Sequence, residues 1–427
     1  MAEVLGDRRA GLGARAAPRL EVEFVAGARG PVARGDGAGL GTVVANRELV
    51  DMAAPGARSK RHLEIALPEG ASYRPGDYLA VLPLNPEAVV ERALARFGLA
   101  PDAGLVLRVP EGGDSPLPVG SPVTAGELLA GYVELSRPAT RGQIGRLARA
   151  AAHPKARHAL SALADDDALH TAEVLERHVT VLDLLERHPE CALAFAAFLE
   201  MHAPLAPRRY SISSSPRWHA GRATLTVALV GGRAGGGPEG AASAYLGRAA
   251  PGTPIAVTVL PSAGAFRPPP SLATPMVMAC AGTGIAPFRA FLQDRALRAR
   301  EEGVRPAPAL LFFGCDHPEV DYLYRDELAA WSEAGVVDVR TAFSAAPRDG
   351  VRYVQDRLWR DRADVVELFR AGAVFYVCGD GRRMAPAVHA TCARIYREAT
   401  GASPAEAEEW LTRMRFHHGR YLTDAFI

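Results

Sequence analysis

The most informative stretch of this 427-residue chain reads Arg208-Arg209-Tyr210-Ser211-Ile212-Ser213-Ser214-Ser215-Pro216. Side chains two residues apart on a strand point to the same face, so Arg208 and Tyr210 would lie together. A guanidinium can meet a pyrophosphate, and a phenol ring can cover a flavin with the hydroxyl of Ser211 beside it. So short a string also occurs by chance as a strand with a polar edge, so its surroundings decide between the two interpretations.

Runs typical of short strands lie on both sides of this stretch, separated by Pro-Gly turns. They are residues 41–45, 62–67, 77–82, 209–214, 223–230 and 254–260. Between residues 86 and 201 the apolar residues instead recur at helical spacing, as in 88–97, 143–152 and 179–185. We therefore expect an antiparallel barrel with a helical insertion.

After Pro275 the pattern alternates between strand and helix, which indicates a parallel, doubly wound sheet. The expected strands are 276–279, 309–313, 336–342 and 374–378, and the expected helices are 288–300, 322–332, 353–360 and 384–398. Ligands of such sheets bind at the carboxyl ends of the strands. Motifs that directly follow these strands are therefore candidates for function.

Three glycine-containing turns come before expected helices. Gly282-Thr283-Gly284 follows the first parallel strand, where two glycines let the backbone approach a diphosphate at a helix N-terminus. Cys378-Gly379-Asp380 follows a later strand, so its thiol is either an inert core group or a neighbour of bound nicotinamide. Gly240-Ala241-Ala242-Ser243 suits a second pyrophosphate, although alone it would be an ordinary helix start.

Composition limits the classes of partner. Lys plus Arg number 49 against 48 acidic residues, so the net charge of +1 gives no argument for nucleic acid or a membrane. Five widely spaced cysteines, with no apolar spanning run or signal segment, indicate a cytoplasmic protein. We expect no metal, because Asp165-Asp166-Asp167 is typical of a helix start and His417-His418 of a surface pair.

Taken together, these motifs resemble the ferredoxin-NADP reductase superfamily, and most closely the FAD/NADPH half of diflavin reductases in self-sufficient bacterial cytochrome P-450 fusions. Similar segments include Arg61-His62-Leu63-Glu64-Ile65, Asp321-Tyr322-Leu323-Tyr324 and Tyr376 to Val388. The resemblance implies an FAD-binding barrel over residues 36–270, with a helical connecting insertion at about 86–201. A Rossmann-like NADP-binding domain would cover residues 271–427, and residues 1–35 would be a linker or tail.

The resemblance also implies site residues. For FAD they are Arg208, Tyr210, Ser211, Val227, Gly240, Ala241, Ala242, Ser243 and Phe426. For NADP they are Arg61, Gly282, Thr283, Gly284, Ser344, Arg348, Arg352, Tyr353, Gln355, Gly379, Asp380 and Met384. Ser211, Cys378, Asp424 and Phe426 would surround the place where hydride passes from nicotinamide to flavin.

The chain departs from the family pattern at three places. Ala345 follows Ser344 where the family has Arg, and Val351 stands where a Lys precedes the Tyr-Val-Gln run, so Arg348 or Arg352 would have to compensate. Each charged hydrogen bond contributes roughly 1.5 to 3 kcal/mol, so losing two could remove the preference for NADPH over NADH. In addition, Phe426 replaces a Trp, and Cys280-Ala281 replaces Gly-Pro.

We therefore expect an FAD-containing reductase that accepts hydride from NADPH, with NADH as a second donor. Electrons would pass to a flavodoxin-like FMN domain serving a haem-thiolate monooxygenase, either upstream in a longer chain or as separate chains, because the sequence contains neither of these domains. The alternatives are the flavoprotein of sulfite reductase, a stand-alone ferredoxin or flavodoxin reductase, and an inactive docking module.

Overall fold

The computed structural model describes residues 20–25, 38–109, 115–231, 240–262, 264 and 266–426. The chain forms two compact units. The first comprises Met1–Ala33 and Asn85–Leu205, and the second comprises Arg34–Leu84 and Ala206–Ile427. Of the expected N-terminal tail, only residues 20–25 are described.

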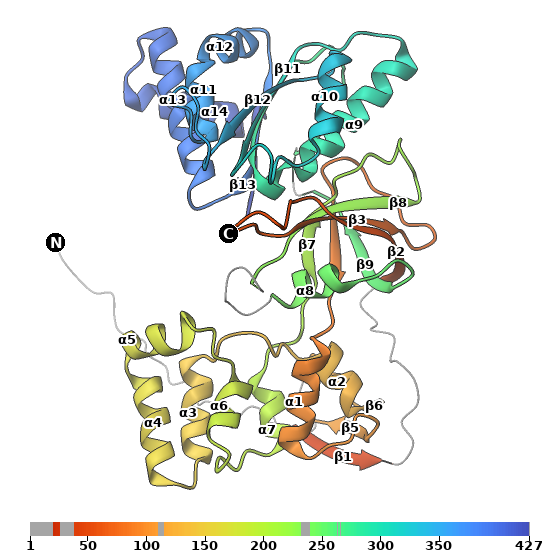
Figure 1. Ribbon diagram of the computed structural model, residues 1–427, viewed down its shortest axis with the longest axis vertical. Coiled ribbons are helices and arrows are strands. Elements are labelled where there is room, and N and C mark those ends of the chain that lie inside the picture. The colour runs from red at the N-terminus through yellow and green to blue at the C-terminus, as the bar shows by residue number, and fades with distance from the viewer. Residues whose placement is uncertain are drawn as a thin grey trace, which may run out of the picture. The chain divides into compact units, whose positions relative to one another are not determined.

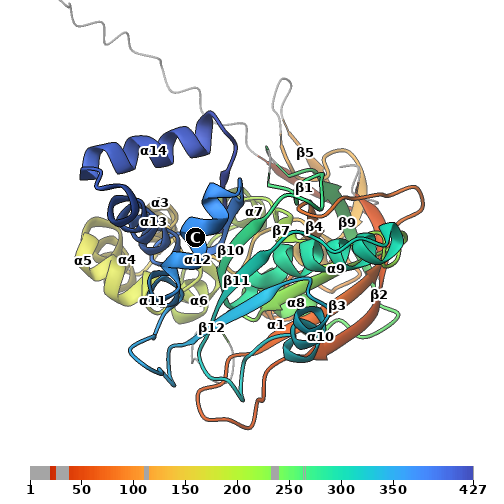
Figure 2. The same cartoon turned by 90° about the horizontal axis from the view of Figure 1, so that it is seen from above.

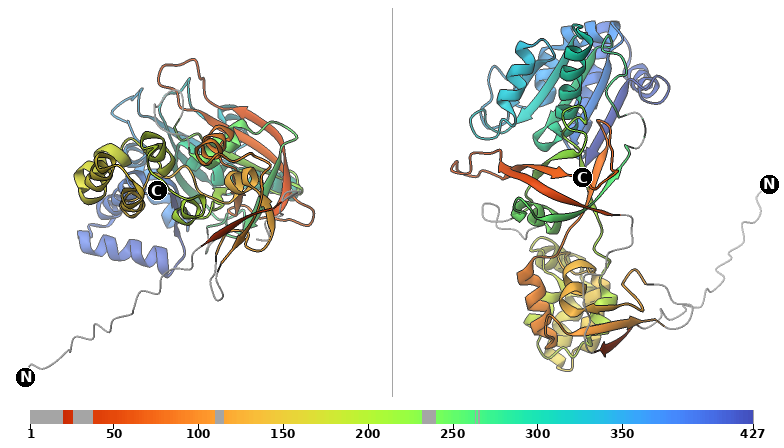
Figure 3. Two further views of the ribbon diagram at one scale, coloured as in Figure 1. Left: turned by 90° about the horizontal axis from the view of Figure 1, so that it is seen from below. Right: turned by 90° about the vertical axis from the view of Figure 1, so that its right-hand side faces the viewer.

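The first unit is mainly helical, with one small antiparallel sheet in the order β1-β5-β6. In the right-hand view of Figure 3 its red and orange strands lie beside the olive helices of the same unit. The strands are β1 (Glu21–Val25), β5 (Gly104–Arg108) and β6 (Pro122–Thr124). The helices are α1 (Glu87–Phe97), α2 (Ala125–Gly131), α3 (Arg141–Ala150), α4 (Pro154–Asp165), α5 (Asp167–His170), a π-helical turn at Thr171–Leu175, α6 (Val181–Arg187) and α7 (Phe195–Met201).

Local sequence sets where these helices begin. Thr124, Thr140 and Thr180 each cap a helix reciprocally with the side chain three residues later, which satisfies two backbone N–H groups at each start. The carboxylate of Asp166 likewise accepts the N–H groups of Ala168 and Leu169, so the acidic run is a helix start. The helical insertion is confirmed, whereas β5 was not expected.

The second unit contains a six-stranded antiparallel sheet in the order β7-β4-β9-β2-β3-β8. Its strands are β2 (Gly39–Glu48), β3 (Lys60–Ala66), β4 (Tyr78–Leu82), β7 (Arg208–Ser211), β8 (Arg222–Ala228) and β9 (Pro254–Leu260), and α8 (Ala241–Arg248) lies beside them (Figure 1). The two edge strands approach each other beyond β7, where Ile212 pairs with Leu225. Leu63, Ile65 and Leu79 are among the fully buried side chains that fill its core.

The same unit contains a five-stranded parallel sheet in the order β12-β11-β10-β13-β14. Its strands are β10 (Met276–Ala281), β11 (Ala309–Cys315), β12 (Asp338–Phe343), β13 (Val374–Asp380) and β14 (Tyr421–Phe426). Helices α9 (Ile285–Glu302) and α10 (Arg325–Glu333) lie on one face. Helices α11 (Val354–Arg360), α12 (Arg362–Arg370), α13 (Met384–Thr400) and α14 (Pro404–Phe416) lie on the other (Figure 2).

The fold class expected from the sequence is therefore confirmed, as an α/β parallel sheet wound on both faces together with antiparallel strands. In the sequence, β14 and α14 were not recognised as elements, although β14 contains Asp424 and Phe426. No helix in the described ranges is long and apolar enough to cross a membrane. The described residues also contain no group of three or more His, Cys, Asp or Glu placed to hold a metal ion.

Arg289 of α9 joins the two sheets of the second unit. Its guanidinium is buried and donates to both carboxylate oxygens of Glu327, at 2.7 and 3.0 Å, and to the carbonyl of Ser213, at 2.7 Å. It also lies 4.7 Å from the ring centroid of Tyr324. A buried cation with every partner in place is costly to disrupt, because removing one partner leaves a desolvated charge.

His62 of β3 packs at the same junction and predicts a pH effect on stability. Burial, with the charges of Arg289 and Arg47, lowers its pKa from 6.5 to about 3, and its Nδ1 lies 3.1 Å from the hydroxyl of Tyr324. Below pH 6.5 the His62 ring is therefore protonated in the unfolded chain, whereas in the folded chain it is protonated only below about pH 3. The free energy of unfolding therefore falls as the pH drops through this range.

Between pH 8 and pH 5, the protonation of His62 in the unfolded chain should lower the free energy of unfolding of the wild type by about 2 kcal/mol. In His62→Gln this part of the loss should be absent. Urea unfolding at the two pH values measures this difference. His417→Gln, at an exposed position, should leave the loss unchanged. An equal loss in wild type and His62→Gln would show that this ring does not govern acid sensitivity.

The position of Gly284 should also make the fold sensitive to substitution, because a Cβ there would lie 2.4 Å from the carbonyl oxygen of Cys378 at the end of β13. This oxygen belongs to the backbone, so it cannot move away as the end of a flexible side chain could. Gly284→Ala should lower the free energy of unfolding by about 1 to 3 kcal/mol. The control is Gly221→Ala, where the nearest atom would lie 3.7 Å away. Equal stability of the two variants would contradict the close approach of this turn to β13.

Candidate functional site

A pocket of about 440 Å³ opens at the carboxyl ends of the parallel strands, and we call it the first pocket. Its lining comes from β3, from the ends of β10, β11 and β13 and the turns that follow the parallel strands, and from the starts of α11 and α13. The residues are Lys60, Ala281, Gly282, Gly314, Cys315, Asp316, Asp321, Ser344, Arg352, Tyr353, Val354, Gln355, Asp380, Arg383 and Met384.

Two glycines with positive φ lie at strand ends beside the first pocket, and Gly282 lines it. Gly282 has φ +54°, a left-handed conformation that favours glycine, and it begins the short turn between β10 and α9. Gly379 has φ +147°, and a Cβ there would lie 3.0 Å from the sulfur of Met384. The backbone approaches closely at Gly379, where a Cβ would lie 3.5 Å from the backbone nitrogen of Ala281, and at Gly284, which faces the carbonyl oxygen of Cys378.

The wall formed by the ends of β11 and β12 is polar. The hydroxyl of Ser344 donates to Oδ1 of Asp316 at 2.7 Å. The guanidinium of Arg352 lies 5.3 Å from the ring centroid of Tyr353, which is half exposed. Arg348 is exposed in the neighbouring turn and does not line the pocket, so the structure brings Ser344 and Arg352 together but leaves Arg348 outside.

Lys60 and Asp321 were missed as pocket residues in the sequence. Nζ of Lys60 lies 2.5 Å from Oδ2 of Asp321, and both side chains are largely buried. Burial alone would raise the pKa of Asp321, but hydrogen bonds from the backbone of His317, from Lys60 and from the backbone of Asp316 outweigh it and lower the pKa. A single lysine in an arginine-rich sequence is a weak indication of a binding residue. Only the fold shows that Lys60 lies opposite the Gly282 turn.

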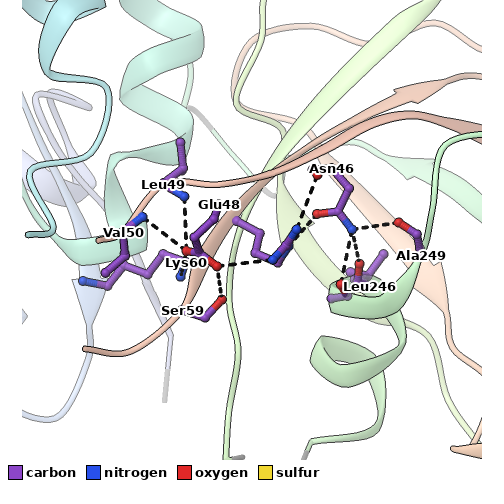
Figure 4. A network of polar contacts seen from close by, with 10 residues as sticks. Asn46, Glu48, Leu49, Val50, Ser59, Lys60, Leu246 and Ala249 are labelled. Carbon is purple, nitrogen blue, oxygen red and sulfur yellow. Dashed lines mark hydrogen bonds and ion pairs between the residues drawn. The ribbon is translucent and has the colours of Figure 1, made fainter. Parts of the chain in front are cut away.

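Arg61, the neighbour of Lys60, does not line the first pocket. Its Nε donates to Oδ1 of Asn46 at 2.6 Å, and its guanidinium forms an ion pair of 3.3 Å with Glu48. The amide of Asn46 in turn donates to the carbonyls of Leu246 and Ala249 at the end of α8. Figure 4 shows this network from Glu48 on one side to Leu246 and Ala249 on the other. Arg61 therefore supports α8 and is not part of the first pocket.

A second pocket, of about 560 Å³, lies between the antiparallel sheet and β14. Its lining residues are Tyr78, Arg209, Tyr210, Ser211, Thr226, Ala228, Thr283, Ala286, Asp424, Ala425 and Phe426. Burial raises the pKa of Tyr210 to about 12, although the charge of nearby Arg208 acts in the opposite direction. Arg208 and Tyr210 lie two residues apart on β7, and it is Arg209 rather than Arg208 that lines this pocket.

Asp424 is the polar centre of the second pocket. Its Oδ1 accepts the hydroxyl of Tyr78 at 2.6 Å, and its Oδ2 accepts the hydroxyl of Ser211 at 3.2 Å. Cys378 is paired with Asp424 between β13 and β14, but its side chain is buried and lines neither pocket. Burial and the charge of Asp424 raise the pKa of this thiol, so it stays protonated. Tyr78 was not recognised from the sequence.

The remaining candidates lie on the antiparallel sheet and α8. Val227 is 1% exposed and belongs to the core, while Thr226 and Ala228 on either side of it line the second pocket. The hydroxyl of Ser243 accepts the N–H of Val230 and donates to the carbonyl of Gly240, so both of its bonds stabilise the helix start. The N-cap position of α8 has no side-chain cap.

The two pockets meet at the turn after β10, because Gly282 lines the first and the adjacent Thr283 lines the second. Ligands bound in the two pockets would therefore both contact this turn. That arrangement suits the transfer of a hydride between two bound rings, which requires reacting atoms about 3 to 3.5 Å apart.

The side chains present fit FAD in the second pocket. Two tyrosine rings, Tyr78 and Tyr210, supply flat apolar faces, and the Ser211–Asp424 pair supplies polar groups at the same place. The uncapped start of α8 supplies backbone N–H groups of the kind that bind a pyrophosphate. The first pocket, with its glycine turn at a helix start, fits a dinucleotide.

Comparisons with known proteins agree that one part of the chain binds FAD and another part binds a nicotinamide dinucleotide. Residues 40–245 match the FAD binding domain family, and residues 278–390 match the oxidoreductase NAD-binding domain family. A self-sufficient cytochrome P450 monooxygenase of Phanerodontia chrysosporium is 43% identical over 91% of this chain and 36% of its own length.

Two bacterial proteins show a similar relationship. Bifunctional cytochrome P450/NADPH–P450 reductases of Bacillus subtilis and Bacillus cereus are 38% and 39% identical, over 96% and 95% of this chain. The chain spans 39% and 38% of their lengths, so it corresponds to somewhat more than a third of each relative. The chain therefore belongs to the family of FAD- and NAD(P)-binding oxidoreductases that includes the reductase portions of these cytochrome P450 fusions.

Proposed function

We propose that this chain is an FAD-containing reductase that oxidises NADPH or NADH and passes the electrons on to a one-electron carrier. The main support for this proposal is that one turn lines both pockets, the first through Gly282 and the second through Thr283. Asp424 joins the two sheets at the second pocket. When bound, FAD supplies the redox chemistry, because a flavin can take two electrons together and release them singly.

The residues of the chain bind and orient the reactants. Tyr210 would cover the flavin, Arg208 would meet its pyrophosphate, and the start of α8 would bind the same group. Thr283 and the glycine turn would hold the diphosphate of the nicotinamide nucleotide. Ser211 and Asp424 would fix the nicotinamide ring, since both oxygens of this carboxylate are already held in place by hydroxyls. Phe426, half exposed at the pocket, would shield the flavin from water.

We also propose the partners. The relatives are named as cytochrome P450 monooxygenases and P450 reductases, which supports a haem-thiolate monooxygenase as the final electron acceptor, reached through an FMN domain. These partners would be joined to this chain or be separate from it. The five cysteines are all free and buried, which supports a reducing cytoplasm. The comparisons favour neither sulfite reduction nor an inactive docking module.

The purified chain should be yellow, and its flavin should bleach under anaerobic conditions on adding NADPH or NADH. It should reduce ferricyanide quickly but cytochrome c slowly, because the two matched families bind FAD and NAD and supply no FMN relay for single electrons. Absorbance at the flavin band and the two steady-state assays measure these outcomes. A colourless protein that cannot be reconstituted with FAD would contradict the proposal.

Tyr210→Ala should weaken FAD binding about tenfold, because the variant loses one aromatic face. The dissociation constant is measured by titrating FAD into the deflavinated protein. Trp218→Ala removes a partly exposed aromatic ring outside both pockets and should leave that constant unchanged. Equal FAD affinity in all three proteins would place the flavin elsewhere.

Asp424→Ala should slow anaerobic flavin bleaching by about tenfold to a hundredfold while the FAD content stays the same, because nicotinamide loses its fixed polar neighbour. Rapid mixing with NADPH measures the bleaching rate. Asp326→Asn changes an exposed acid at the start of α10 and serves as the control. An unchanged rate in Asp424→Ala would remove this carboxylate from the proposed site.

A further inference from the structure

We propose that Asp316 makes the first pocket select a nucleotide with a free 2′-hydroxyl on its adenosine ribose. NADH would then be bound at least as tightly as NADPH, which differs only by a phosphate at that hydroxyl. This inference rests on the proposed function, because it concerns the choice of nucleotide by the same site.

The position of Asp316 in the sheet supports this selection. Asp316 directly follows β11, and β11 lies beside β10, the strand that ends at the Gly282 turn. In doubly wound nucleotide-binding sheets, a carboxylate that follows the second strand hydrogen-bonds the ribose 2′-hydroxyl, whereas a nearby arginine accommodates a 2′-phosphate. The first pocket therefore has an acid at the position that distinguishes the two nucleotides.

Hydrogen bonds fix both Asp316 and Ser344. The N–H of Asp316 donates to Asp321 at 2.9 Å, and the carbonyl of Asp316 accepts the N–H of Ala345 at 2.9 Å. The hydroxyl proton of Ser344 is directed to the carboxylate of Asp316, so the serine presents its oxygen lone pairs to a ligand. A ribose hydroxyl can donate to such acceptors, but an ionised phosphate has no proton to donate.

The charges around the pocket do not compensate for Asp316. Its lining contains three basic residues, Lys60, Arg352 and Arg383, and three acidic ones, Asp316, Asp321 and Asp380. Lys60 is already paired with Asp321 at 2.5 Å. Within the described parts of the chain no ion pair to Asp316 occurs, so no basic side chain neutralises the charge that it brings to the pocket lining.

The neighbouring segments add no further cation at this wall. Ala345 and Val351 are uncharged, and Arg348 lies outside the pocket. Arg352 does line the pocket, so it is the residue that would attract a 2′-phosphate against the repulsion of Asp316. The balance between Asp316 and Arg352 therefore decides which nucleotide binds more tightly.

The test measures equilibrium binding of NAD⁺ and NADP⁺ to the FAD-loaded protein by calorimetry, which needs no turnover. In the wild type, NAD⁺ should bind at least as tightly as NADP⁺. Asp316→Asn keeps the size of the side chain and removes its charge. This variant should shift the ratio of the two dissociation constants at least tenfold toward NADP⁺, and Asp316→Ser should shift it in the same direction.

The matched control is Asp349→Asn, because Asp349 is an exposed acid in the next turn that lies outside the first pocket and interacts with Arg360 at 3.2 Å. In this variant the ratio of the NAD⁺ and NADP⁺ dissociation constants should stay within twofold of the wild-type ratio. Tighter binding of NADP⁺ than NAD⁺ by the wild type, or an unchanged ratio in both Asp316 variants, would overturn the inference while leaving the reductase function in place. A protein that binds neither nucleotide would overturn both.

Discussion

The carboxylate of Asp424 joins the parallel and the antiparallel sheet, and the proposed site depends on this contact. Asp424, on the last strand of the parallel sheet, accepts hydroxyl groups from Tyr78 and Ser211 of the antiparallel sheet. The bonds hold the end of β14 against β4 and β7, so a pocket lined by tyrosine rings lies beside the glycine turn after β10. Because this pocket takes its lining from both sheets, its shape depends on how β14 is held against β4 and β7.

The surrounding polar contacts keep that junction rigid. Arg289 crosses from α9 to Ser213, while Lys60 of β3 binds Asp321 in the segment after β11. Each buried charge has partners of opposite charge or a carbonyl, so each is stable only when both sheets are in place. The fold thus couples correct assembly of the site to its electrostatics, which is why the site residues come from segments far apart in the sequence.

The sequence predicted the fold class because its signals are local. Period-two runs, apolar helical spacing and the alternation after Pro275 each depend on neighbouring residues, and the structure has strands and helices at those places. Tyr78 and Lys60 could not be found in this way. Each looks like an ordinary strand residue, and only the pairing of distant strands brings Tyr78 to Asp424 and Lys60 to the first pocket.

Arg61 shows another limit of local signals, since its motif predicts a nucleotide ligand while its side-chain contacts with Asn46 and Glu48 appear only in the fold. The measurement that most directly tests the central claim is a crystal structure of the chain with FAD and an oxidised nicotinamide nucleotide. The account predicts the flavin against Tyr210 and the nicotinamide ring in contact with it, with Asp424 and Ser211 beside both. Rings held apart in separate pockets, or a flavin away from Tyr210, would contradict it.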